Sequence, residues 1–118
     1  MFEIYVPDKN DSLSKVVLSG TTYYLRFTLN GRYGYWSIGL YDASKNRMLP
    51  MTKISPCIDL FQFYPYIGFP KGHLVCVSQE DDVDTDAFTE ARARMFYFTD
   101  EDMETMAGLL GLEWTEDE

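Results

Sequence analysis

The amino-acid sequence predicts an all-β domain, a small antiparallel barrel or sandwich of about seven strands, with one short C-terminal α-helix. Aromatic residues make up 16% of the 118 residues, and aromatic and β-branched side chains suit the half-buried surface of a sheet. Short runs of alternating apolar and polar residues are separated by Gly, Pro, Asn or Asp. With 46% hydrophobic residues, a chain of this length is expected to form one domain around one modest core.

The first half of the chain is expected to form strands joined by short turns. Pro7 ends the first strand, and residues 8–12 are expected to form a polar loop. The pair Asn30-Gly31 predicts a type I′ turn, because both central residues of that turn need positive φ. Residues 21–54 should therefore form a meander, with Tyr23 and Leu25 on one face of its first strand and Tyr24 and Arg26 on the other. The expected strands are residues 2–6, 13–18, 21–29, 33–41 and 47–54.

Residues 55–72 differ from the rest, because prolines interrupt a very apolar, aromatic segment. Proline removes backbone donors, so only a short strand fits, at residues 59–64. Two interpretations remain open: the loop covers an open end of its own barrel, or it presents a contact surface to another subunit. A loop of this length inside a small domain is often functional. The aromatic residues that would form the contact surface are Phe61, Phe63, Tyr64, Tyr66 and Phe69.

Two further strands are expected at residues 73–78 and 93–99, with an acidic loop at 80–86 and a helical turn at 87–92 between them. Thr99 then has the features of a helix N-cap, with carboxylates in the first turn after it. Met103, Met106 and Leu110 form one apolar stripe at helical spacing, which would dock on the chain's own barrel or on a neighbour. The expected divisions are a β domain at 1–100, the helix at 100–111 and an acidic tail at 112–118.

The net charge of −9 disfavours nucleic acid and anionic membranes as partners, because phosphate binding needs Lys and Arg to displace counterions. No run of the sequence has the apolar length that spans a bilayer. The N-terminal residues lack the basic start and apolar stretch of a signal peptide. The sequence therefore predicts a protein made in the cytosol or built into a particle there.

Motifs for catalysis and cofactors are missing from the sequence, and neither a cofactor nor a metal is expected. His73 is interpreted as a structural histidine, and Cys57 and Cys76 as reduced thiols in or near the core; a catalytic pair of a Cys with His73 is the weaker interpretation. The run from Asp82 to Asp86 resembles the start of a calcium loop. Ala87 and Ala93, however, stand where the sharp-turn Gly and the bidentate Glu are needed.

Two other classes of function remain as alternatives. A binding module for carbohydrate or for a host protein would use the exposed aromatics Tyr24, Tyr35 and Tyr41, whose plainer interpretation is a cross-strand ladder or a subunit contact. A small hydrolase would need a pair of carboxylates, and its best version would draw on the acids at positions 59, 82, 84 and 86.

The order and spacing of these features resemble the baseplate plug proteins of cyanophage-like contractile phage tails. No single piece is diagnostic, and a Gly expected near Lys53 is absent. The segment 101–118 extends past the family's usual end, so the helix and tail have no support from the resemblance. The residues that carry it are, in order, Tyr23-Tyr24-Leu25-Arg26-Phe27, Leu29-Asn30-Gly31-Arg32-Tyr33-Gly34-Tyr35-Trp36, Ile38-Gly39-Leu40-Tyr41-Asp42, Met48-Leu49, Asp59-Leu60-Phe61, Tyr64-Pro65-Tyr66, Phe69-Pro70-Lys71-Gly72-His73-Leu74 and Arg94-Met95-Phe96-Tyr97-Phe98-Thr99-Asp100.

The resemblance implies a non-enzymatic structural protein of the virion, placed as a central plug near the tube–spike junction of the baseplate. Its implied partners are other baseplate, tube or spike proteins and further copies of itself, with assembly in the host cytoplasm. No catalytic residue comes with the resemblance.

Overall fold

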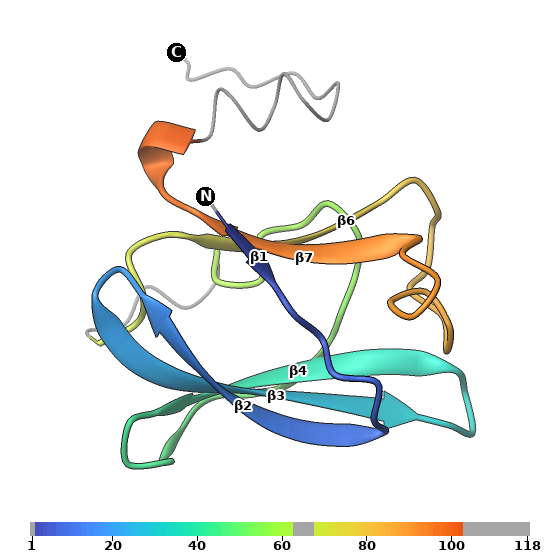
Figure 1. Cartoon of the computed structure of the whole chain (residues 1–118), viewed down its shortest axis with the longest axis horizontal. Helices are drawn as coiled ribbons and strands as arrows, with labels where there is room; N and C mark the ends of the chain where they lie inside the picture. Colours follow the sequence, from blue (N-terminus) through green and yellow to red (C-terminus); the bar gives the residue numbers. More distant parts are fainter. Residues whose placement is uncertain (1, 63–67, 103–118) are drawn as a thin grey trace.

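Two antiparallel β-sheets face each other in a sandwich, which the computed structural model describes over residues 2–62 and 68–102. The smaller sheet has the strand order β1-β7-β6 and the larger one β2-β3-β4-β5; Figure 1 shows them as two layers. The all-β prediction is confirmed, and of its two forms the sandwich is the right one, because the two sheets remain separate rather than closing into a barrel. The strands are β1 (Phe2–Ile4), β2 (Asp11–Leu18), β3 (Thr21–Asn30), β4 (Tyr35–Asp42), β5 (Arg47–Lys53), β6 (His73–Ser78) and β7 (Ala93–Phe98).

The larger sheet is the meander that the sequence predicts. Its consecutive strands pair in order, and the alternation along β3 places Leu25 and Phe27 in the core while Tyr24 and Arg26 face outward. The expected polar loop before it is shorter than predicted, because β2 already begins at Asp11. A strand with period two buries one face and solvates the other, so this sheet has a dry inner face and a polar outer face.

The turn between β3 and β4 corrects the sequence prediction. Asn30 pairs with Tyr35, so the loop has four residues, and neither Asn30 nor Gly31 has positive φ. Gly34 adopts the left-handed conformation instead, with φ of 70°, and donates its N–H to the carbonyl of Asn30. The Asn30 side chain also accepts hydrogen bonds from the N–H groups of Arg32 and Tyr33. The type I′ prediction was wrong because Asn30 caps the turn with its side chain and Gly34 supplies the positive φ.

The smaller sheet brings the two ends of the described chain together. Phe2 of β1 lies opposite Tyr97 of β7, and β7 pairs in turn with β6 along its whole length. The guanidinium of Arg94 makes two hydrogen bonds, of 2.9 and 2.7 Å, to the carboxylate of Glu3, 91 residues away in sequence. The pairing of β1 with β7 therefore joins residues that are distant in sequence, and no local sequence pattern predicts it.

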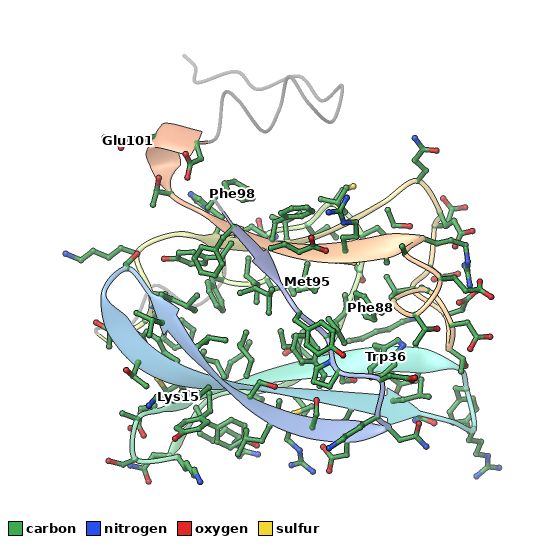
Figure 2. All side chains as sticks on the ribbon, in the orientation of Figure 1. Lys15, Trp36, Phe88, Met95, Phe98 and Glu101 are labelled. Carbon is green, nitrogen blue, oxygen red and sulfur yellow. The ribbon has the colours of Figure 1, made fainter. Side chains whose placement is uncertain are left out.

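The core lies between the two layers and includes side chains from the connecting loops. Trp36 of β4 is buried, and its ring contacts the edge of Phe88 at 5.6 Å between centroids. Phe88 comes from the β6–β7 connection and also contacts Phe27 at 6.5 Å. Figure 2 shows Trp36, Phe88 and Met95 in the space between the sheets. Loop and sheet residues thus share one core, which fixes the loop against the larger sheet.

Three local predictions at element boundaries have separate outcomes. The chain around Ala87 forms hydrogen-bonded turns but no regular helix. The short strand expected from residue 59 is reduced, within its described part, to a single bridge between Asp59 and Val75. The capping interaction is present, since the Asp102 carboxylate accepts the N–H of Thr99 at 3.1 Å. A 3-10 turn covers Asp100–Asp102, and the rest of the helix predicted for 100–111 lies outside the described residues.

Candidate functional site

The aromatic segment at 55–72, predicted as a loop cover or a contact surface, is only partly described. Phe61 is buried with 6% of its surface exposed, and its ring meets the edge of Phe69 at 5.9 Å. Phe69 is half-buried and packs against the same core. These two rings therefore cover the core of their own chain, as the first interpretation expects. Six of the predicted contact residues lie outside the described residues: Phe63, Tyr64, Tyr66, Met103, Met106 and Leu110.

Asp59 attaches this segment to the edge of β6. One carboxylate oxygen accepts the N–H groups of Phe61 at 3.0 Å and Leu74 at 3.1 Å, and the other lies 2.7 Å from Nδ1 of His73. Backbone bonds from Cys57 to Cys76 and from Leu60 to Leu74 follow the same edge. Sequence reasoning treated Asp59 only as a member of a hypothetical carboxylate pair. Only its local bond to the N–H of Phe61 could have been expected, because an Asp side chain commonly accepts the backbone N–H two residues on in an Asx turn.

The histidine and the two cysteines have structural surroundings. Besides its contact with Asp59, the His73 ring stacks obliquely on Phe98 at 5.5 Å. Both cysteines are free thiols; Cys76 is buried as predicted, whereas Cys57 is exposed, so its predicted place in or near the core is wrong. Burial of Cys76 raises the pKa of its thiol to about 12, so it stays protonated and is a poor nucleophile. These groups give no arrangement for covalent catalysis.

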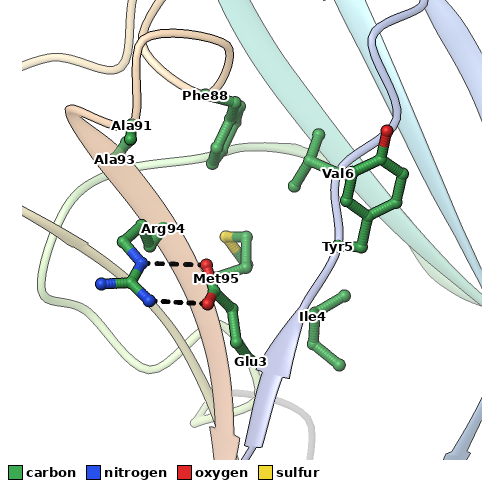
Figure 3. Close-up of a pocket in the computed structure, with 9 residues that line it drawn as sticks. All are labelled: Glu3, Ile4, Tyr5, Val6, Phe88, Ala91, Ala93, Arg94 and Met95. Carbon is green, nitrogen blue, oxygen red and sulfur yellow. Dashed lines mark hydrogen bonds and ion pairs between the residues drawn. The ribbon is translucent and has the colours of Figure 1, made fainter.

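A groove of about 290 Å³ opens between the N-terminal strand and β7 (Figure 3). The ion pair of Arg94 with Glu3 lies along one side, and the hydrogen bonds from Arg94 hold the pKa of the Glu3 carboxyl below its ordinary value. Its lining contains no histidine, thiol or hydroxyl nucleophile other than the Tyr5 phenol. The groove therefore has an apolar floor and one neutralised charge pair. Its lining residues are Glu3, Ile4, Tyr5, Val6, Phe88, Ala91, Ala93, Arg94 and Met95.

The acidic loop, defined here as residues 79–92 between β6 and β7, is organised around one arginine. The Arg92 guanidinium binds Glu80, Asp84 at 2.9 Å and Glu90 at 2.7 Å. Hydrogen bonds from Arg92 lower the pKa of the Asp84 carboxyl. Across the described ranges, no three His, Cys, Asp or Glu side chains gather as a metal site. Arg92 thus ties together three carboxylates of the acidic loop and offsets part of their negative charge.

The outward tyrosines of the larger sheet carry cations on their rings. The ammonium of Lys45 lies 5.1 Å from the ring centroid of Tyr24, and that of Lys53 lies 5.3 Å from that of Tyr35. A sugar that stacked on either ring would have to displace the cation. The geometry therefore disfavours the carbohydrate interpretation of Tyr24 and Tyr35, and the pairing of Tyr24 with Tyr41 across β3 and β4 agrees with a cross-strand ladder.

Comparison with known proteins gives one family. No curated protein matches the sequence. Separately, the described part of the chain contains no helix that is long and apolar enough to cross a membrane. Residues 1–101 match the model of a family described as cyanophage baseplate Pam3 plug gp18. The match ends where the resemblance was expected to end, before the C-terminal segment. With more than four-fifths of its length matched, the chain belongs to this family of cyanophage baseplate plugs and is a structural component of a phage tail baseplate.

Proposed function

We propose that the chain is the central plug near the tube–spike junction of its baseplate and that it acts by subunit assembly without catalysis. Family membership over residues 1–101 carries the proposal. The chemistry of the described residues agrees with it, because the buried thiol, the anchored His73 and the charge-paired groove leave no reactive constellation. Its partners would be baseplate, tube or spike proteins and further copies of itself, with no role for nucleic acid or membrane.

Contact with these partners is proposed for two groups of residues that lie outside the described ranges. The first is the aromatic segment with Phe63, Tyr64 and Tyr66, which continues from the core-covering Phe61. The second is the stripe of Met103, Met106 and Leu110 in the C-terminal segment. Rings and thioethers bury large or adaptable apolar area, which suits a protein interface.

The location is tested by a cryo-EM map of purified particles, in which density for the sandwich should close the central channel. Density only at the baseplate periphery, or absence of the protein from purified particles, would contradict the proposal.

The contact residues are tested by incorporation of a Tyr64→Ser/Tyr66→Ser variant into particles. We expect this variant to fold but to be incorporated less than the wild type. Tyr33→Ser is the matched control, because Tyr33 is 69% exposed and lies on the turn between β3 and β4. Equal loss in both variants would contradict the assignment of these residues.

A further inference from the structure

Charge is divided between the two halves of the sandwich. Residues 11–53, which form the larger sheet, contain six basic and two acidic residues, whereas residues 73–102 contain two basic and nine acidic residues. The whole chain is acidic, so a basic sheet is not a consequence of composition. The separation of basic from acidic residues therefore points to a role for the surface on which the basic side chains lie.

The outer face of the larger sheet, called the cationic face, presents Lys15, Arg26, Lys45, Arg47 and Lys53 between Tyr24, Tyr35 and Tyr41. The strand register sets this arrangement, because Lys15, Tyr24, Tyr41 and Arg47 lie opposite one another across the four strands. Leu25 and Leu40, which adjoin Tyr24 and Tyr41 along the strands, are buried in the core, so these side chains lie on the opposite, outer face of the larger sheet. The face is therefore one continuous surface.

Most cations of this face have no carboxylate partner within the described ranges. Arg26 alone is paired, through two hydrogen bonds to Asp11. Lys45 and Lys53 rest on tyrosine rings instead, which holds their ammonium groups at the surface at low entropic cost. A groove of about 310 Å³, lined by Asp11, Arg26, Tyr41 and Lys45 among others, hollows the face. Tyrosine and arginine on a preformed, hollowed surface are typical of protein interfaces.

Unpaired carboxylates lie on the acidic loop, which connects β6 and β7 of the smaller sheet (Figure 1). Asp81, Asp82 and Asp86 are exposed and form no ion pair among the described residues, in contrast to the three acids bound by Arg92. The loop is held in place by Trp36, whose indole N–H donates to the carbonyls of Asp84 at 3.2 Å and Thr85 at 3.4 Å. The chain thus displays rigid, uncompensated charge of both signs on two separate surfaces.

We propose that the cationic face docks the acidic loop of a second copy of this chain. A symmetric contact through either surface would bring like charges together, whereas a head-to-tail contact pairs opposite charges. Head-to-tail contacts generate closed rings when the rotation between copies closes. The inference deepens the proposed function, on which it rests for the premise that the chain works by assembly, and it names the two surfaces that meet.

The test uses two charge-reversed variants of the full chain. The face variant carries Lys15→Glu, Lys45→Glu and Lys53→Glu; the loop variant carries Asp81→Lys, Asp82→Lys and Asp86→Lys. All six side chains are solvent-accessible and outside the core, and circular dichroism would verify the fold of each variant. The matched control carries Lys9→Glu, Arg32→Glu and Lys71→Glu, which changes the net charge as much as the face variant does but outside the cationic face.

Light scattering after size exclusion should show wild-type self-association that weakens as salt screens the charges. Each variant alone should be monomeric, because its face and its loop carry charge of the same sign. Their equimolar mixture should associate again, because the native loop of one variant meets the native face of the other, and the two reversed surfaces also have opposite charge. The control should associate like the wild type. The loop variant has less net charge than the wild type, so non-specific repulsion predicts more association for it, the opposite of our expectation.

Three results would overturn the proposal. One is a wild type that stays monomeric at low salt, and a second is self-association that both variants retain. The third is binding of a short duplex DNA that the face variant loses, which would assign the face to nucleic acid. The protein's presence in purified particles, measured by mass spectrometry, is an independent readout, so the baseplate role could stand while the head-to-tail contact fails.

Discussion

Replacing Gly72 by alanine should destabilise the fold because the added methyl group has no room. Its Cβ would lie 2.5 Å from Oη and 2.6 Å from Cζ of Tyr97, and 2.8 Å from the carbonyl oxygen of Phe98. The Tyr97 ring is buried, and its hydroxyl is 2.6 Å from that of Ser19. Overpacking costs about 1–3 kcal/mol, and moving the ring would also remove this hydrogen bond, worth about 1 kcal/mol. We therefore expect the free energy of unfolding to fall by about 2–4 kcal/mol.

Urea unfolding, followed by circular dichroism, measures this loss. With a slope of about 1.5 kcal/mol per molar urea, the midpoint should drop by about 2 M. Gly31→Ala is the matched control: an added Cβ there meets nothing within 4 Å, and φ is not left-handed. It should change the free energy of unfolding by less than about 1 kcal/mol. Equal midpoints for the two variants would show that the close approach at Gly72 does not constrain the fold.

Three further perturbations have defined outcomes. Asp59→Ala leaves two backbone N–H groups and His73 without their shared acceptor, and should lower the urea-unfolding free energy by about 2–4 kcal/mol, with less loss for Asp59→Asn; no loss would refute the anchoring role. Phe88→Ala removes a ring packed between two others, and thermal unfolding should show a loss of about 2–4 kcal/mol unless the loop repacks. Acidification should destabilise the protein, because arginines lower the pKa values of Glu3, Asp11 and Asp84. That stability is present above the unfolded-state pKa values and lost as pH falls through the lower folded-state values, so melting temperatures should decrease below about pH 4, and a flat profile there would contradict the ion pairs.

Local patterns in the sequence predicted most strands and their faces, because apolar and polar residues alternate along a half-buried strand. The alternation at Leu25 and Phe27 was sufficient to identify the inner face of the larger sheet. The Asn30 turn was mispredicted because two conformations compete for the same residues, and the side-chain cap together with Gly34 decides between them. Turn type depends on which residue caps the turn and which adopts positive φ, and a dipeptide pattern does not decide between these.

Long-range contacts could not be predicted from the sequence. Nothing near Glu3 indicates that it will meet Arg94, and nothing near Asp59 indicates that it will reach the edge of β6. The two charged surfaces were equally hidden, because the acidic total conceals a basic sheet until the register aligns its side chains. Partners separated by tens of residues become neighbours only after the chain has folded.

Under the proposed head-to-tail contact, Trp36 has a consequence for the rate and affinity of assembly. Trp36 holds the acidic loop through its indole N–H and its contact with Phe88. The loop is therefore ordered when the chain folds, before it meets a second subunit. Ordering a loop on contact would slow association and weaken the complex. A subunit whose loop is already ordered binds without this entropic cost, so more of the contact free energy contributes to the stability of the assembled particle.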